Sequence, residues 1–129
     1  DAIVTDHSPH APEEKDREYG LAPSGFPGLE TAVGVLLTDL VHTGKIDLPL
    51  LISKMTWEPA KAFGLAAGTL SVGANADVTV LDPNLEWTVV AEEFHTRGSH
   101  SPFAGRKLKG KAVLTVVDGN IVMQDGRVF

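Results

Sequence analysis

Hydrophobic and polar positions follow three different patterns along the chain. Residues 1–5 form a short apolar run that is typical of a strand. From Pro27 onward, apolar residues recur at spacings of three and four, which is the period of a helix packed on one face. From Gly68 the spacing falls to two, as in a half-buried strand. The pattern therefore predicts one strand, a long loop, three helices and then an antiparallel sheet.

Capping residues divide the helical section into three. The first helix opens near Pro27 and stops before Gly44, and its apolar face comprises Leu29, Val33, Leu36, Leu37 and Leu40. Asp47 is placed to cap the second helix. The third helix starts at Thr56 and ends at Gly64, a residue that readily adopts the left-handed conformation of a helix end.

Turn residues divide the second half into strands. The predicted strands are 77–81, 86–90, 111–117, 120–123 and 127–129. Asp82-Pro83-Asn84 is typical of a turn between the first two strands. Asp118-Gly119 is a strong hairpin signal, because both residues tolerate the positive φ that tight hairpins require.

Length bounds the fold. A complete (β/α)8 barrel needs about 250 residues, and the chain has 129. Asp1 already lies in the first predicted strand, so we expect the sequence to be a piece of a longer protein.

Composition excludes several classes of function. The net charge is −6, and the one basic cluster consists of Arg106, Lys107, Lys109 and Lys111. We interpret that cluster as a solvated strand edge rather than a phosphate site, so neither nucleic acid nor a membrane surface is an expected partner. The chain has no cysteine, which excludes disulfides and thiolate metal sites. A cytoplasmic protein with a small-molecule substrate is the expectation.

The densest group of reactive side chains is Thr5-Asp6-His7-Ser8-Pro9-His10. Asp6 follows an apolar strand, where α/β enzymes place their chemistry, and it could bind a metal, accept a proton from water, or simply cap the loop. His7 and His10 could form a metal pair with Asp6, bind a substrate, or serve the loop structurally. A catalytic zinc needs three protein ligands, so a self-contained metal site is disfavoured.

A second group spans residues 22–30 and includes Ser24, Gly25 and Gly28. Glycines let a backbone approach a ligand closely, and the free N–H groups of the helix that follows favour an anion. The alternative is a turn that needs glycine for its geometry alone. The charge run Glu13-Glu14-Lys15 is interpreted as solvated.

These motifs together resemble the C-terminal part of the dihydroorotases, in the amidohydrolase superfamily. The resemblance covers essentially the whole chain and is carried by Asp6-His7-Ser8-Pro9-His10, residues 12–15, Pro23-Ser24-Gly25, Gly28-Leu29-Glu30 and Ser101-Pro102-Phe103-Ala104-Gly105. Ala76-Asp77 and the strand after it resemble a more general motif of the superfamily.

The resemblance implies an α/β fold and a division into two parts. Residues 1–67 would supply the last strand, active-site loop and C-terminal helices of a metal-dependent (β/α)8 barrel. Residues 68–129 would supply antiparallel strands of a small β-sandwich domain.

The implied reaction is the reversible hydrolysis of dihydroorotate to N-carbamoyl-L-aspartate in pyrimidine biosynthesis. Asp6 would be both the catalytic acid–base and a metal ligand, with zinc as the cofactor and its other ligands upstream. His10 would bind the substrate carboxylate, and Ser24 and Gly25 would contact the ring through their backbone. His7 would support the loop. The chain alone is expected to be inactive.

Two alternatives stay open. One is an allantoinase or dihydropyrimidinase-type cyclic amidase, although relatives of the allantoinase type tend to carry Cys at the position of His10. The other is a non-catalytic dihydroorotase-like subunit that scaffolds a carbamoyltransferase. For the assembly of the intact protein, a homo-oligomer and association with a carbamoyltransferase are both open.

Overall fold

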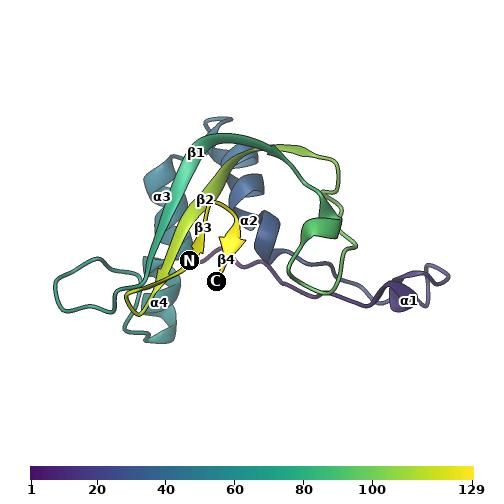
Figure 1. The fold of residues 1–129 in the computed structure, drawn as a ribbon, viewed down its shortest axis with the longest axis horizontal. Coiled ribbons are helices and arrows are strands. Elements are labelled where there is room, and N and C mark those ends of the chain that lie inside the picture. The colour runs from purple at the N-terminus through teal and green to yellow at the C-terminus, as the bar shows by residue number, and fades with distance from the viewer.

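The computed structural model describes all of residues 1–129 and combines a four-stranded antiparallel sheet with helices packed beside it (Figure 1). The strands follow one another in the order β1-β2-β3-β4. In chain order the elements are α1 (Pro12–Lys15), α2 (Leu29–Leu36), the π-helical turn η1 (Leu37–Val41), α3 (Leu48–Met55), α4 (Trp57–Phe63), β1 (Val78–Thr88), the 3-10 turn η2 (Ala91–Glu93), β2 (Lys107–Val117), β3 (Asn120–Gln124) and β4 (Arg127–Val128). The long loop that carries α1 projects from the rest of the chain.

The three predicted helices begin and end close to the predicted residues, whereas the short helix α1 lies within the segment that was predicted to be a loop. Asp47 caps α3 by accepting a hydrogen bond from the Leu50 N–H at 2.8 Å. Gly64 ends α4 in the left-handed conformation, with φ of +65°. The first predicted helix is confirmed as α2 continued by η1, and Gly44 follows it with φ of +73°. None of the helices has the length and apolar character that crossing a bilayer requires.

The predicted turn at residues 82–84 is wrong. β1 runs without a break from Val78 to Thr88, because β2 pairs with it on both sides of an irregularity between Asp82 and Glu86. Asp82 Oδ1 accepts the N–H groups of Asn84 and Leu85 at 2.8 and 3.1 Å, so the carboxylate takes the place of a strand partner there. The turn residues therefore make a bulge rather than a chain reversal.

The predicted hairpin at Asp118-Gly119 is confirmed. Both residues have positive φ, +49° and +77°, and β2 and β3 pair directly on either side of them. Asp77 Oδ1 accepts the Asp118 N–H at 2.8 Å, which ties the hairpin to the start of β1.

Residues 1–5 do not form the predicted strand. Ile3 donates its N–H to the Lys54 carbonyl at 3.0 Å, but none of the four strands pairs with this segment. A strand is stabilised by its ladder of hydrogen bonds, so an extended segment without a neighbouring strand remains irregular.

The core lies where α2 and η1 meet the sheet. Leu37 and Leu108 are both buried there. Two glycines allow the close approach: a Cβ at Gly34 would lie 2.8 Å from the Trp87 ring, and one at Gly110 would overlap Leu37. Only 12 of 129 residues are buried, so the packed part of the chain is small.

Candidate active site

His7 is the acceptor that caps α2. Its Nδ1 accepts the N–H groups of Gly28 and Leu29 at 3.1 and 3.3 Å. In this arrangement Nδ1 carries no proton, so the neutral ring holds its proton on Nε2. These two N–H groups at the start of the helix already have an acceptor, so they are not available to an anion. The expectation that they would bind one is wrong. The expectation that His7 supports the loop agrees with this geometry.

His10, Ser24 and Gly25 lie together. His10 Nε2 donates to the Ser24 carbonyl at 2.8 Å, and Nδ1 lies 3.6 Å from Glu14 Oε2. A Cβ at Gly25 would lie 2.6 Å from Ser8 Cβ and 3.5 Å from His10 Nε2, and the φ of Gly25 is +110°. Only glycine fits this position, because a side chain would be both strained and in collision. His10 thus forms one cluster with two residues that lie 14 and 15 positions further along the chain.

The sequence pattern indicated that residues 13–15 are solvated, but Glu14 and Lys15 form hydrogen bonds within the loop. Lys15 Nζ donates to the carbonyls of Pro23 and Gly25, both at 2.9 Å. Glu14 accepts the Ala11 N–H at 3.1 Å and so closes the first turn of α1. Lys15 therefore connects the first half of the loop, which contains α1, to the second half, which leads into α2. The Glu at the third helical position was a usable signal for the cap, whereas nothing in the sequence marked Lys15 as buried in part.

Asp6 is different from the other polar residues of this loop. The side-chain hydrogen bonds that hold the loop come from His7, His10, Glu14 and Lys15, and none comes from Asp6. Its side chain is exposed, and its φ of +46° is one of three positive values at non-glycine residues. Aspartate tolerates this conformation better than most residues. The carboxylate does not cap the loop and is free to take a ligand or a proton.

The chain does not contain a complete metal centre. No group of three or more His, Cys, Asp or Glu side chains is placed to hold an ion. His7 Nδ1 and His10 Nε2 are engaged in hydrogen bonds to the backbone, which disfavours the His7–His10 metal pair. An exposed carboxylate without an internal partner fits the part of a single ligand.

A segment after the first strand packs against this loop. Glu30 Oε2 accepts the His95 N–H at 2.9 Å and Oε1 accepts the Thr96 N–H at 3.1 Å. Phe103 packs edge-on against Phe26, with the ring centroids 5.8 Å apart. Glu30 and Phe103 thus connect the segment after β1 to α2 and to the residues just before α2. The spacing of these motifs in the sequence did not indicate this contact.

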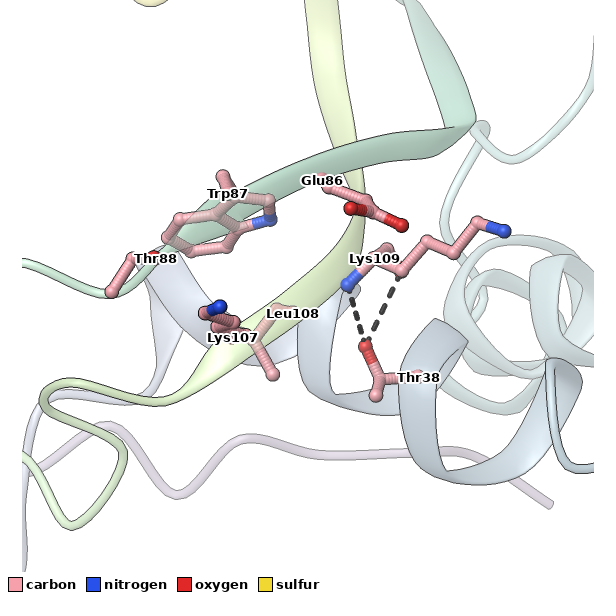
Figure 2. A pocket seen from close by; sticks show the side chains of 7 residues that line it. All are labelled: Thr38, Glu86, Trp87, Thr88, Lys107, Leu108 and Lys109. Carbon is pink, nitrogen blue, oxygen red and sulfur yellow. Dashed lines mark hydrogen bonds between the residues drawn. The ribbon is translucent and has the colours of Figure 1, made fainter.

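Two hollows of the surface lie away from Asp6 and His10. One of about 360 Å³ is drawn in Figure 2 and is lined by Thr38, Glu86, Trp87, Thr88, Lys107, Leu108 and Lys109. Its less exposed polar groups are already paired: Thr38 Oγ1 accepts the Lys109 N–H at 2.8 Å, and Trp87 donates to the Gly110 carbonyl at 3.0 Å. A second hollow, of about 480 Å³, lies between α2 and the sheet. Neither contains Asp6 or His10, so neither is the candidate site.

Three of the four residues in the basic cluster beside the first hollow lie near acidic residues. Lys109 and Lys111 are the register partners of Glu86 and Asp82 in the β1–β2 ladder, and Arg106 forms an ion pair with Asp39. The Lys111 ammonium lies 4.7 Å from the centre of the Trp87 ring. These contacts agree with the interpretation of the cluster as a strand edge.

Comparison with known proteins gives the family. The amidohydrolase family model matches residues 2–122. The dihydroorotase of Geobacter sp. (strain M21) is 52% identical over 126 residues, which are 98% of this chain and 29% of that protein. The dihydroorotase of Pelotomaculum thermopropionicum is 50% identical over 125 residues, 97% of this chain and 29% of that protein. The chain thus spans about 29% of the length of the curated relatives it matches.

Solved structures agree with this result. A D-hydantoinase (dihydropyrimidinase) from Thermus sp. matches all of this chain and 29% of its own, with a TM-score of 0.90 and 30% identity. An L-hydantoinase (dihydropyrimidinase) from Arthrobacter aurescens matches 87% of this chain and 25% of its own, with a TM-score of 0.82 and 38% identity. The predicted fold class, part of an amidohydrolase barrel followed by antiparallel strands, is confirmed. By its sequence and its fold, the chain belongs to the amidohydrolase family.

Proposed function

We propose that the intact protein is a dihydroorotase, which opens the ring of dihydroorotate reversibly to give N-carbamoyl-L-aspartate. The observation that carries the proposal is the cluster of His10, Ser24 and Gly25, held by Lys15 on the loop that also bears Asp6. The dihydroorotases at about half identity over almost the whole chain support it.

His10 is proposed to bind the substrate carboxylate. Its Nε2 donates a hydrogen bond to the Ser24 carbonyl at 2.8 Å, and its Nδ1 lies 3.6 Å from a Glu14 carboxylate oxygen, so both ring nitrogens already face oxygen atoms. A carboxylate would replace one of these acceptors and form a stronger, charge-assisted bond. The loop around Ser24, which is exposed, and Gly25 is proposed to contact the ring through its backbone.

Asp6 is proposed to move the proton. Water adds its oxygen to the carbonyl carbon of the cyclic amide, the C–N bond breaks, and the proton taken up by Asp6 passes to the leaving nitrogen. The carboxylate suits this task because the loop makes no use of it.

Asp6 is also the metal ligand that this chain would contribute. A divalent ion, with Zn²⁺ as the proposed one, supplies Lewis-acid polarisation of the amide carbonyl when bound. The remaining ligands would come from outside these residues. A cytoplasmic location belongs to the same proposal, in line with the acidic, cysteine-free composition.

A hydantoinase or dihydropyrimidinase-type activity is the second candidate. It is favoured by the TM-score of 0.90 to the Thermus enzyme, but that enzyme is 30% identical, against 52% for the dihydroorotase of Geobacter. A scaffold subunit for a carbamoyltransferase is disfavoured because Asp6 and His10 are both present.

The test is a substrate panel with the intact, metal-loaded protein: dihydroorotate, dihydrouracil, hydantoin and allantoin. We expect ring opening of dihydroorotate, with the other three much poorer. Activity on the uncharged rings without activity on dihydroorotate would overturn the proposal. No activity on any ring, in protein that retains its metal, would favour the scaffold.

A further inference from the structure

We propose that residues 94–105, here called the strap, are a positioning element for the substrate carboxylate, and that Glu30 and Gly98 are the residues through which it acts. This inference rests on the proposed function, because it concerns how His10 is held. Neither residue is proposed to touch the substrate.

The strap is fastened to α2 by Glu30. The carboxylate accepts two consecutive backbone N–H groups, from His95 and Thr96, at 2.9 and 3.1 Å. Hydrogen bonds to an ionised acceptor are the stronger kind. Glu30 belongs to the first turn of the same helix that His7 caps, so the strap and the loop are tied to one helix end.

The strap touches the loop at His10 itself. Gly98 is buried, and a Cβ there would lie 2.9 Å from Pro9 Cβ, 3.0 Å from the His10 carbonyl oxygen and 3.2 Å from the His10 N. The contact is therefore backbone against backbone at the residue proposed to bind the carboxylate. Gly98 does not have a positive φ, so its lack of a side chain is needed for space rather than for conformation.

A second contact supports the other limb of the loop. Phe103, near the end of the strap, packs on Phe26 just before α2. The strap returns to the sheet at Gly105, whose N–H bonds the Val89 carbonyl at 2.8 Å. The strap thus contacts the loop both at His10 and at Phe26. A shift of the strap would therefore move the backbone of His10.

Loss of the contact between the strap and the loop should weaken substrate binding more than it slows the chemical step. Displacement of a binding group by about 1 Å can cost up to about 100-fold, but Asp6 lies four residues from His10 and forms no hydrogen bond or ion pair with the strap. We therefore expect a rise in KM for dihydroorotate with little change in kcat.

The experiment compares variants of the intact, metal-loaded protein. Gly98→Ala tests the contact by steric displacement. Its matched control is Gly20→Ala, because Gly20 is exposed, lacks positive φ and would meet only the flexible end of Glu18. Glu30→Ala removes both hydrogen bonds, whereas Glu30→Gln keeps one carbonyl oxygen for them. Hydrogen exchange of residues 7–10 is measured in parallel, since it shows whether the strap holds this part of the loop in place, independently of activity.

The expected result is a rise in KM of about tenfold for Gly98→Ala and Glu30→Ala, a smaller rise for Glu30→Gln, and none for Gly20→Ala. In all four kcat should stay within about threefold, and exchange at residues 7–10 should rise in Glu30→Ala. Unchanged KM and exchange in Glu30→Ala would overturn the proposal, even if Gly98→Ala does not fold. A loss of kcat at constant KM would overturn it as well. If the unaltered protein does not open dihydroorotate, the proposed function fails, and the exchange measurement still decides whether the strap holds the loop.

Discussion

The polar residues of the loop before α2 divide into those that hydrogen-bond to its backbone and Asp6, which does not. His7, Glu14 and Lys15 each satisfy backbone groups of the loop or of the helix after it. Asp6 does none of this, although it stands beside His7 in the chain. A loop of this length without strands needs such internal bonds, because its backbone groups lose water where the two limbs meet.

Replacement of Asp6 by Asn should separate chemistry from folding. Asn is isosteric and also tolerates the φ of +46° at this position, so the thermal unfolding of the intact protein should hardly change. Loss of the proton acceptor should lower kcat on dihydroorotate by at least ~100-fold. Near-normal turnover in a correctly folded Asp6→Asn protein would remove Asp6 from the reaction.

Replacement of His7 should lower the stability of the protein, in contrast to replacement of Asp6. His7→Ala leaves the N–H groups of Gly28 and Leu29 without their acceptor, and loss of a helix cap costs about 1 kcal/mol. His7→Asn offers an oxygen close to the position of Nδ1 and should recover most of that stability. The check is denaturant unfolding of the intact protein, and equal stability of the Ala and Asn variants would show that the cap contributes nothing.

The sequence could reveal only part of this loop. Resemblance to a family singled out Asp6, His10, Ser24 and Gly25, and the structure brings the last three together. Lys15 was missed because a lysine in a charged run is usually solvated; its two acceptors are backbone carbonyls, which carry no sequence signal.

At the scale of elements, local signals predicted the ends of helices and the hairpin. Asp47, Gly64 and Asp118-Gly119 act through bonds within a few residues, so their sequence neighbourhood is sufficient. The segments at residues 1–5 and 82–84 were misjudged because their structure depends on distant partners. The former lacks a paired strand, and the latter is held straight by β2.

The approach of η1 to β2 yields a prediction about stability. Ala at Gly110 would place its Cβ against Leu37 and would also be strained at φ of +109°. We expect a loss of about 3 kcal/mol or more in the free energy of unfolding. Gly73→Ala is the control, because its φ is +90° but nothing lies within 4 Å of the added carbon; strain alone should cost about 1 kcal/mol. Equal losses would mean that the close packing is not needed.

At the scale of the molecule, the 129 residues leave much apolar surface uncovered. Phe63 is 74% exposed and Leu70 is 81% exposed, and few residues are buried. Uncovered apolar patches of this kind bind hydrophobic dyes and other proteins. The isolated chain should therefore bind 8-anilinonaphthalene-1-sulfonate and unfold over a broad temperature range. Sharp cooperative unfolding of a monomer without dye binding would contradict this expectation.

The division of the chain near residue 67 stays a prediction. α2 and β2 lie on opposite sides of that boundary and pack closely, with Thr38 of η1 bonded to Lys109. The two parts therefore share an interface.

We propose that this loop recognises the carboxylate of dihydroorotate through His10. Dihydrouracil has the same ring without that carboxylate, so the ratio of kcat/KM for the two substrates isolates the contribution of the carboxylate. In the intact, metal-loaded protein we expect a strong preference for dihydroorotate, and His10→Ala should reduce it by at least about tenfold, the scale of a hydrogen bond to a charged group. A ratio that is unchanged by His10→Ala, or that favours dihydrouracil in the unaltered protein, would rule out recognition of the substrate carboxylate by His10.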